Sequence, residues 1–112
     1  MKELKSFTIE AEFIPTFMER GWGNGYVAIP KGHKLYEVDY QHEAFYDVDV
    51  NGGLTYGNSA ENLLKDPEGR GIDPKAWVLG FDTAHLYDTM GRWPELAVEE
   101  EANKLLEQVK NL

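Results

Sequence analysis

The chain has no cysteine, no long apolar run and no surplus of basic residues, and each absence excludes a class of protein. Without cysteine there are no disulfides, no thiolate metal ligands and no cysteine nucleophile. No stretch approaches the roughly 18 apolar residues of a membrane span. The N-terminal segment MKELKSFTIEAEF carries acids where a signal peptide is apolar. We therefore expect a soluble cytoplasmic protein without a membrane partner.

The charge balance is acidic, with 20 Asp and Glu against 11 Lys and Arg and a net charge of −9. A groove that follows a nucleic-acid backbone requires an excess of basic side chains, so we expect no nucleic-acid partner. Acids scattered along a chain generally serve solubility. The alternative is an acidic surface that occupies the basic site of another protein.

The chain is long enough for one hydrophobic core. It has 112 residues, of which 42% are hydrophobic and 12% aromatic. This length is close to the commonest domain size, and the apolar content is sufficient to offset the entropy of ordering. We expect a single folded domain spanning residues 1–112.

Several segments have the pattern of β-strands. Apolar and polar residues alternate from Phe7 to Phe13, which predicts a half-buried strand closed near Pro15. A glycine-rich turn should precede a second strand over residues 26–29. The uninterrupted apolar run at residues 76–81 predicts a central strand covered on both faces. Residues 45–56 predict a hairpin around a turn at Asn51-Gly52-Gly53.

The C-terminal segment has the pattern of an amphipathic helix over residues 94–111, after a short helix capped by Ser59 or Asn58. The connections between strands are too short for the crossover helices of a parallel sheet. We therefore predict an α+β fold, with a single mostly antiparallel sheet of four to five strands and the C-terminal helix packed on one face. The buried stripe of this helix is expected to consist of Val98, Ala102, Leu105, Val109 and Leu112.

The segment WVLGFDTAHLYD places three polar residues directly after the central strand: Asp82, His85 and Asp88. Their spacing of three puts the side chains roughly on one side of a helical turn. In a structural interpretation, Asp82 caps the turn and His85 is a hydrogen-bonded, half-buried residue. The other interpretations are a ligand site, a zinc or manganese site, or an Asp–His general base.

Two further segments are candidates for a pocket wall. His33 lies between two lysines in a predicted loop, and it is followed by Tyr36. Such a loop suits an anionic ligand. The turn residues Gly52 and Gly53 allow close approach of a ligand or another backbone, and Thr55 follows them.

These segments, GYVAIPKGHKLY, VNGGLTYG and WVLGFDTAHLYD, occur in the order seen in a family of small proteins of phages and mobile elements, which the chain resembles. Members of that family often carry Cys where this chain has Thr83, so a thiol there is not essential to a shared chemistry. The resemblance implies no particular activity. A viral origin would favour an accessory role in the host cytoplasm, such as binding a signalling nucleotide or blocking a host protein.

Our preferred hypothesis is a module that binds, and in doing so sequesters, a small anionic or nucleotide-like ligand. The pocket would form where the GHKLY, GGLT and FDTAH segments converge. We assign no catalytic residue, no metal ligand and no cofactor. The alternatives are a metal-assisted or Asp/His-assisted hydrolase and an acidic protein that inhibits a host partner, and a homo-oligomer stays open. The proposed ligand-binding residues are His33, Tyr36, Gly52, Gly53, Thr55, Asp82, His85 and Asp88.

Overall fold

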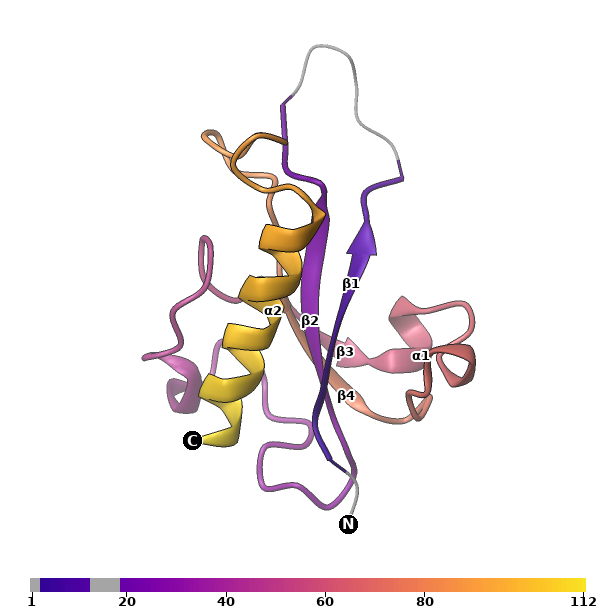
Figure 1. The fold of residues 1–112 in the computed structure, drawn as a ribbon. Helices are drawn as coiled ribbons and strands as arrows, with labels where there is room; N and C mark the ends of the chain where they lie inside the picture. The colour runs from indigo at the N-terminus through magenta and orange to yellow at the C-terminus, as the bar shows by residue number, and fades with distance from the viewer. Residues whose placement is uncertain (1–2, 13–18) are drawn as a thin grey trace.

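The computed structural model describes residues 3–12 and 19–112, which form one antiparallel sheet with a long helix across it (Figure 1). The strand order is β1-β2-β4-β3, and each neighbouring pair is antiparallel. The predicted fold class is therefore confirmed. None of the described helices is long and apolar enough to cross a membrane. The strands are β1 (Lys5–Glu10), β2 (Gly23–Ile29), β3 (Tyr56–Ser59) and β4 (Trp77–Phe81), and the helices are α1 (Ala60–Leu63) and α2 (Glu95–Lys110), with 3-10 turns at Glu43–Phe45 and Glu68–Arg70.

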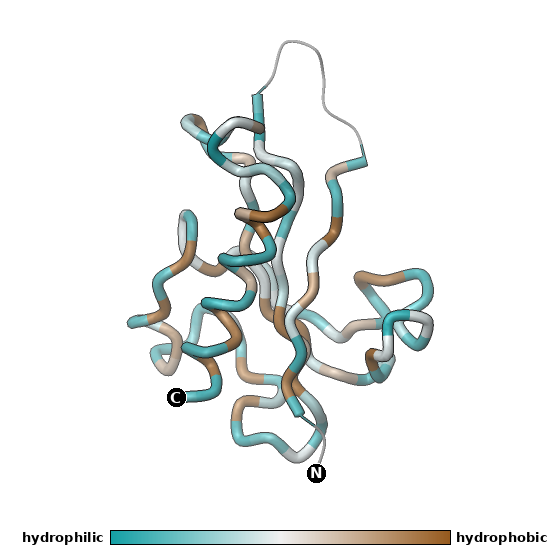
Figure 2. Tube along the Cα trace, in the orientation of Figure 1, coloured by the Kyte–Doolittle hydropathy of each residue, from teal (hydrophilic) through white to brown (hydrophobic). Residues whose placement is uncertain are grey.

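Helix α2 covers one face of the sheet because its apolar stripe recurs every three or four residues (Figure 2). Of the predicted stripe, Val98, Ala102, Leu105 and Val109 are buried, whereas Leu112 follows the end of α2 and is partly buried. They pack against alternate side chains of the two central strands, such as Val27 of β2 and Leu79 of β4, in one core cluster.

The opposite face of the sheet has a smaller core of its own. Tyr26, Ala28 and Val78 point to this side and pack with residues of the segment between β3 and β4, including Ile72 and Ala76. Strand β4 is thus covered on both faces. This explains why its sequence is continuously apolar, and it confirms the predicted central strand.

The strand register defines two ends of the sheet. Gly25 pairs with Phe81 at the end that we call the upper end, and Ile29 pairs with Trp77 at the lower end (Figure 1). Because β2 and β4 are antiparallel, the loop after β4 leaves from the upper end. The loop after β2 leaves from the lower end.

Some predicted element boundaries were wrong. Gly23 and Gly25, expected in a turn, belong to β2. A Cβ on Gly25 would lie 2.5 Å from the Phe81 ring, so the glycine makes room for a buried aromatic side chain. The predicted hairpin is absent, since Phe45 lies in a 3-10 turn rather than a strand. The expected closure of β1 near Phe13 and Pro15 lies outside the described residues.

Candidate functional site

The loop that follows β4 begins with a hydrogen-bonded turn. The backbone N–H of His85 donates to Asp88 Oδ2 at 2.9 Å, and the N–H of Asp88 donates to the His85 carbonyl at 2.9 Å. Asp82 accepts a 3.1 Å hydrogen bond from the Ala84 N–H through Oδ1. The predicted capping role of Asp82 is therefore confirmed.

The imidazole of His85 lies between two carboxylates and is held unequally by them. Its Nδ1 is 2.7 Å from Asp88 Oδ2, whereas its Nε2 is 3.4 Å from Asp82 Oδ1. The first distance is that of a strong charge-assisted hydrogen bond, and the second is much longer. The Asp88 side chain is only 6% exposed, while those of His85 and Asp82 are 38% and 33% exposed. The ring is therefore fixed from its buried side and open to solvent on the other.

Asn51 completes the buried side of this cluster. Its Nδ2 donates to Asp88 Oδ1 and Oδ2, at 3.1 and 3.0 Å, and lies 3.3 Å from the Asp82 carbonyl. Its backbone N–H donates to Glu101 Oε2 at 2.9 Å, which ties the turn to α2. The sequence does not reveal this role of Asn51, because the pair Asn51-Gly52 also has the pattern of an ordinary tight turn.

Gly52 and Thr55 of the GGLT segment also contact the cluster. A Cβ on Gly52 would lie 2.2 Å from His85 Nε2, and the Gly52 φ angle is +71°. The ring therefore requires glycine at this position. Gly53 has a similar φ of +81°, but a Cβ there would meet nothing within 4 Å. Thr55 Oγ1 donates to Asp82 Oδ2 at 3.2 Å.

Asp88 is held as a carboxylate by its surroundings. Burial raises the pKa of its side chain, but hydrogen bonds from the His85 backbone, the His85 ring and the Asn51 amide outweigh burial and lower the pKa below its usual value. Asp88 is thus an anion that orients His85.

The GHKLY segment does not join this cluster. It follows β2 and therefore lies at the lower end of the sheet, so the expected convergence of three segments was wrong. His33 Nδ1 accepts a 3.1 Å hydrogen bond from the Leu35 N–H, and Tyr36 Oη donates to the Lys75 carbonyl at 2.6 Å. The physical reason is the antiparallel pairing of β2 and β4, which sends their following loops to opposite ends.

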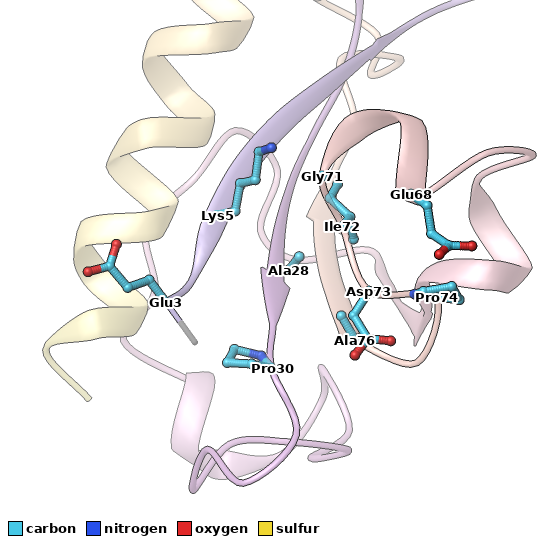
Figure 3. A pocket seen from close by; sticks show the side chains of 10 residues that line it. All are labelled: Glu3, Lys5, Ala28, Pro30, Glu68, Gly71, Ile72, Asp73, Pro74 and Ala76. Carbon is cyan, nitrogen blue, oxygen red and sulfur yellow. The ribbon is translucent and has the colours of Figure 1, made fainter. Parts of the chain in front are cut away.

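An open hollow of about 690 Å³ lies at the lower end (Figure 3). Ala28, Ile72 and Ala76 are buried apolar residues of its lining. Lys5 lies at its edge and donates to the Arg70 carbonyl. The full lining consists of Glu3, Lys5, Ala28, Pro30, Glu68, Gly71, Ile72, Asp73, Pro74 and Ala76.

The upper cluster has the spacing of a metal site. One ligand atom each from Asp82, His85 and Asp88 lies within 4.8 Å of the others, and in the described part of the chain this is the one such group. Asp88 Oδ2 already accepts three hydrogen bonds, from the His85 backbone, the His85 ring and Asn51. Asp82 Oδ1 accepts one, from the Ala84 N–H, so Asp82 Oδ1 and His85 Nε2 are the atoms better placed to contact a cation. Asp88 would then orient the His85 ring through its contact with Nδ1.

Comparison of the chain with protein-family models, with curated proteins and with solved structures finds no match. The interpretation of the site therefore depends on the chemistry of its own residues.

Proposed function

We propose that the chain is a small binding protein for a divalent transition-metal cation of the zinc class, held by Asp82 and His85 at the upper end of the sheet. The observation that carries this proposal is the unequal pair of contacts to the His85 ring. Nδ1 is tightly bound to a buried carboxylate, and Nε2 of the partly exposed ring faces a second carboxylate at 3.4 Å.

The separation of the two facing atoms fits a shared cation. Zinc binds histidine nitrogen and carboxylate oxygen at about 2.0–2.2 Å with a tetrahedral arrangement, which places two ligand atoms about 3.4 Å apart. The distance from His85 Nε2 to Asp82 Oδ1 has this value. The two atoms therefore already have the spacing of two zinc ligands.

The arrangement behind the ring supports the same interpretation. Metal-binding histidines commonly donate their second N–H to a carboxylate, which fixes the tautomer and the orientation of the ring. Asp88 occupies this position with a contact of 2.7 Å, and Asn51 in turn orients Asp88. The ring would thus be set for metal binding before the cation arrives.

The charge of the site favours a cation over an anion. Both carboxylates next to His85 would repel an anionic group, and Asp88 has a lowered pKa that keeps it ionised at neutral pH. For the same reason the anionic-ligand hypothesis receives no support at this end of the sheet. Asp82 and His85 offer two ligand atoms, so solvent would supply the remaining ligands and the affinity should be moderate.

The test is calorimetric titration of the protein with zinc chloride at pH 7. We expect one site per chain, and we expect His85→Asn and Asp82→Asn to abolish it. Asp88→Asn should weaken binding by about 10- to 100-fold, the usual effect of losing a partner that orients a ligand. The matched control is His42→Asn, which removes the exposed histidine that caps the 3-10 turn but keeps a side-chain acceptor for the Ala44 N–H.

Zinc binding that survives both His85→Asn and Asp82→Asn would contradict the proposal. So would the absence of binding in the wild type up to about 1 mM zinc, a concentration at which even a weak specific site is half occupied.

A further inference from the structure

Four exposed apolar side chains lie close in sequence to the cluster of Asp82, His85 and Asp88. Leu86, Tyr87 and Met90 are 86%, 74% and 52% exposed in the loop after β4, and Leu96 is 65% exposed in the first turn of α2. Of the large apolar side chains that are exposed in the described residues, only Tyr46 lies elsewhere in the chain. We call Leu86, Tyr87, Met90 and Leu96 the apolar loop surface.

The loop that presents these side chains is anchored at both ends. The Thr83 carbonyl accepts from the Gly21 N–H at 2.7 Å, and the buried Thr83 Oγ1 donates to the Gly23 carbonyl at 2.6 Å. At the other end, the Trp93 carbonyl accepts from the Trp22 N–H at 2.7 Å. Both ends of the loop are therefore fixed to the segment at Gly21–Gly23. A surface held in place in this way loses little conformational entropy on binding.

The first turns of α2, which directly follow this loop in the chain, are acidic. Leu96 is separated by three and four residues from Glu99 and Glu100, so these side chains share one face of the helix. Glu95 precedes Leu96 in the same turn. All three glutamates are exposed, and none has an ion-pair partner among the described residues. The apolar loop surface is thus accompanied in the chain by three glutamates without an ion-pair partner among the described residues.

We propose that the apolar loop surface, together with Glu95, Glu99 and Glu100, docks a basic amphipathic segment of a partner protein. Apolar side chains of that segment would cover Leu86, Tyr87 and Met90. Its lysines or arginines would meet the glutamates of α2. Aromatic and methionine side chains are enriched in protein interfaces, and charge complementarity selects the partner.

Charge also argues against two other occupants. A second copy of the chain would bring another net charge of −9 against the first, and an anionic membrane surface would be repelled in the same way. A cationic segment is favoured by both the apolar and the electrostatic terms.

The experiment uses three synthetic helical peptides and fluorescence anisotropy at low and high salt. The probe is an amphipathic peptide of Leu and Lys, and its two controls replace Lys by Glu or Leu by Ser. We expect the full chain to bind the Leu/Lys peptide, more weakly as salt rises, and to bind neither control. Binding should persist with a chelator present, since docking does not require the metal.

Matched variants connect the binding to this surface. Leu86→Ser and Met90→Ser should each weaken the binding of the Leu/Lys peptide by about tenfold or more, the scale of an interface hot spot. Tyr46→Ser is the control, because Tyr46 is 76% exposed but lies outside the surface. These exposed positions should tolerate serine without unfolding, which circular dichroism checks.

Equal binding of the peptide by the wild type and by Leu86→Ser would overturn the proposal. Binding of the Leu/Glu peptide with the same affinity as the Leu/Lys peptide would also overturn it. A dimer in sedimentation experiments that Leu86→Ser disrupts would assign the surface to a second copy instead.

Discussion

The two ends of the sheet both carry polar residues after a strand, but they use them differently. At the upper end, Asp82, His85 and Asp88 bond to one another and to Asn51 from a distant turn. At the lower end, His33 accepts its hydrogen bond from a backbone amide of its own loop. At both ends a side chain accepts from a nearby backbone N–H, which shapes the loop. At the upper end the side chains also hold one another across distant segments, an arrangement suited to bind a ligand.

The hollow and the cluster of chemically matched side chains lie at different ends of the sheet. The lower end has the open hollow of about 690 Å³, but Lys5 and Tyr36 there contact backbone carbonyls. The upper end has the matched carboxylates and imidazole. Chemical complementarity, rather than the size of a hollow, locates the site in our account. The following substitutions test this contrast.

The largest effect is expected for Gly52→Ala. The new Cβ would lie 2.2 Å from His85 Nε2, and alanine is disfavoured at a φ of +71°. Overpacking and backbone strain together should lower the free energy of unfolding by about 2–4 kcal/mol. Urea denaturation measures the loss.

Gly53→Ala is the matched control for that prediction. Its φ is +81°, but its Cβ would meet nothing within 4 Å, so only the backbone term of about 1–2 kcal/mol applies. Equal losses for Gly52→Ala and Gly53→Ala would show that the His85 ring does not occupy the position described.

Asp88→Asn should be the next most harmful change. The substitution removes the charge from hydrogen bonds to His85 and presents an amide donor among other donors, which should cost about 1.5–3 kcal/mol at pH 7. Asp49→Asn, at an 86% exposed side chain, should stay within about 0.5 kcal/mol of the wild type.

The pH dependence of this effect has a defined sign. Because the pKa of Asp88 is lowered in the folded protein, its stabilisation is fully present above the unfolded-state pKa of about 3.9 and is lost as pH falls through the folded pKa. The stability difference between the wild type and Asp88→Asn, measured in urea, should therefore shrink from pH 6 to about pH 3. A constant difference would contradict the account.

A smaller loss is expected for Asn51→Ala, which removes the amide that donates to both Asp88 oxygens. We expect the free energy of unfolding, measured by urea denaturation, to fall by about 1–2 kcal/mol. The loss stays small because the buried carboxylate keeps its bonds to His85. Zinc affinity should also fall, since the ring is less well oriented. A stability loss with unchanged zinc affinity would restrict Asn51 to a structural role.

The smallest effect belongs to the lower end. His33→Asn keeps a side-chain acceptor near the Leu35 N–H and should change the free energy of unfolding by less than about 1 kcal/mol. Zinc affinity should not change. A large loss of zinc binding in this variant, measured by calorimetry, would show that the two ends are not independent.

The sequence predicted the parts of the fold that local periodicity determines. The stripe from Val98 to Val109 and the apolar run of β4 were both identified correctly, because each pattern has one stable packing arrangement. The grouping of Asp82, His85 and Asp88 also followed from a spacing of three residues within one turn.

What the sequence could not predict depends on contacts between distant segments. Asn51 reaches Asp88 across 37 positions, and no local pattern marks such a pair. Gly25 was assigned to a turn because the Phe81 ring that requires it belongs to another strand. The placement of His33 away from His85 depends on the order and direction of β2 and β4, which the strand patterns leave open.

The most direct test of a cation held between His85 and Asp82 is the NMR spectrum of the ¹⁵N-labelled imidazole nitrogens during zinc addition. The account predicts that the Nε2 resonance of His85 shifts with saturation at one zinc per chain, that its Nδ1 keeps the pattern of a protonated nitrogen bonded to Asp88, and that His33 and His42 are unchanged. Zinc that shifts His33 or His42 while leaving His85 Nε2 unaffected would contradict it.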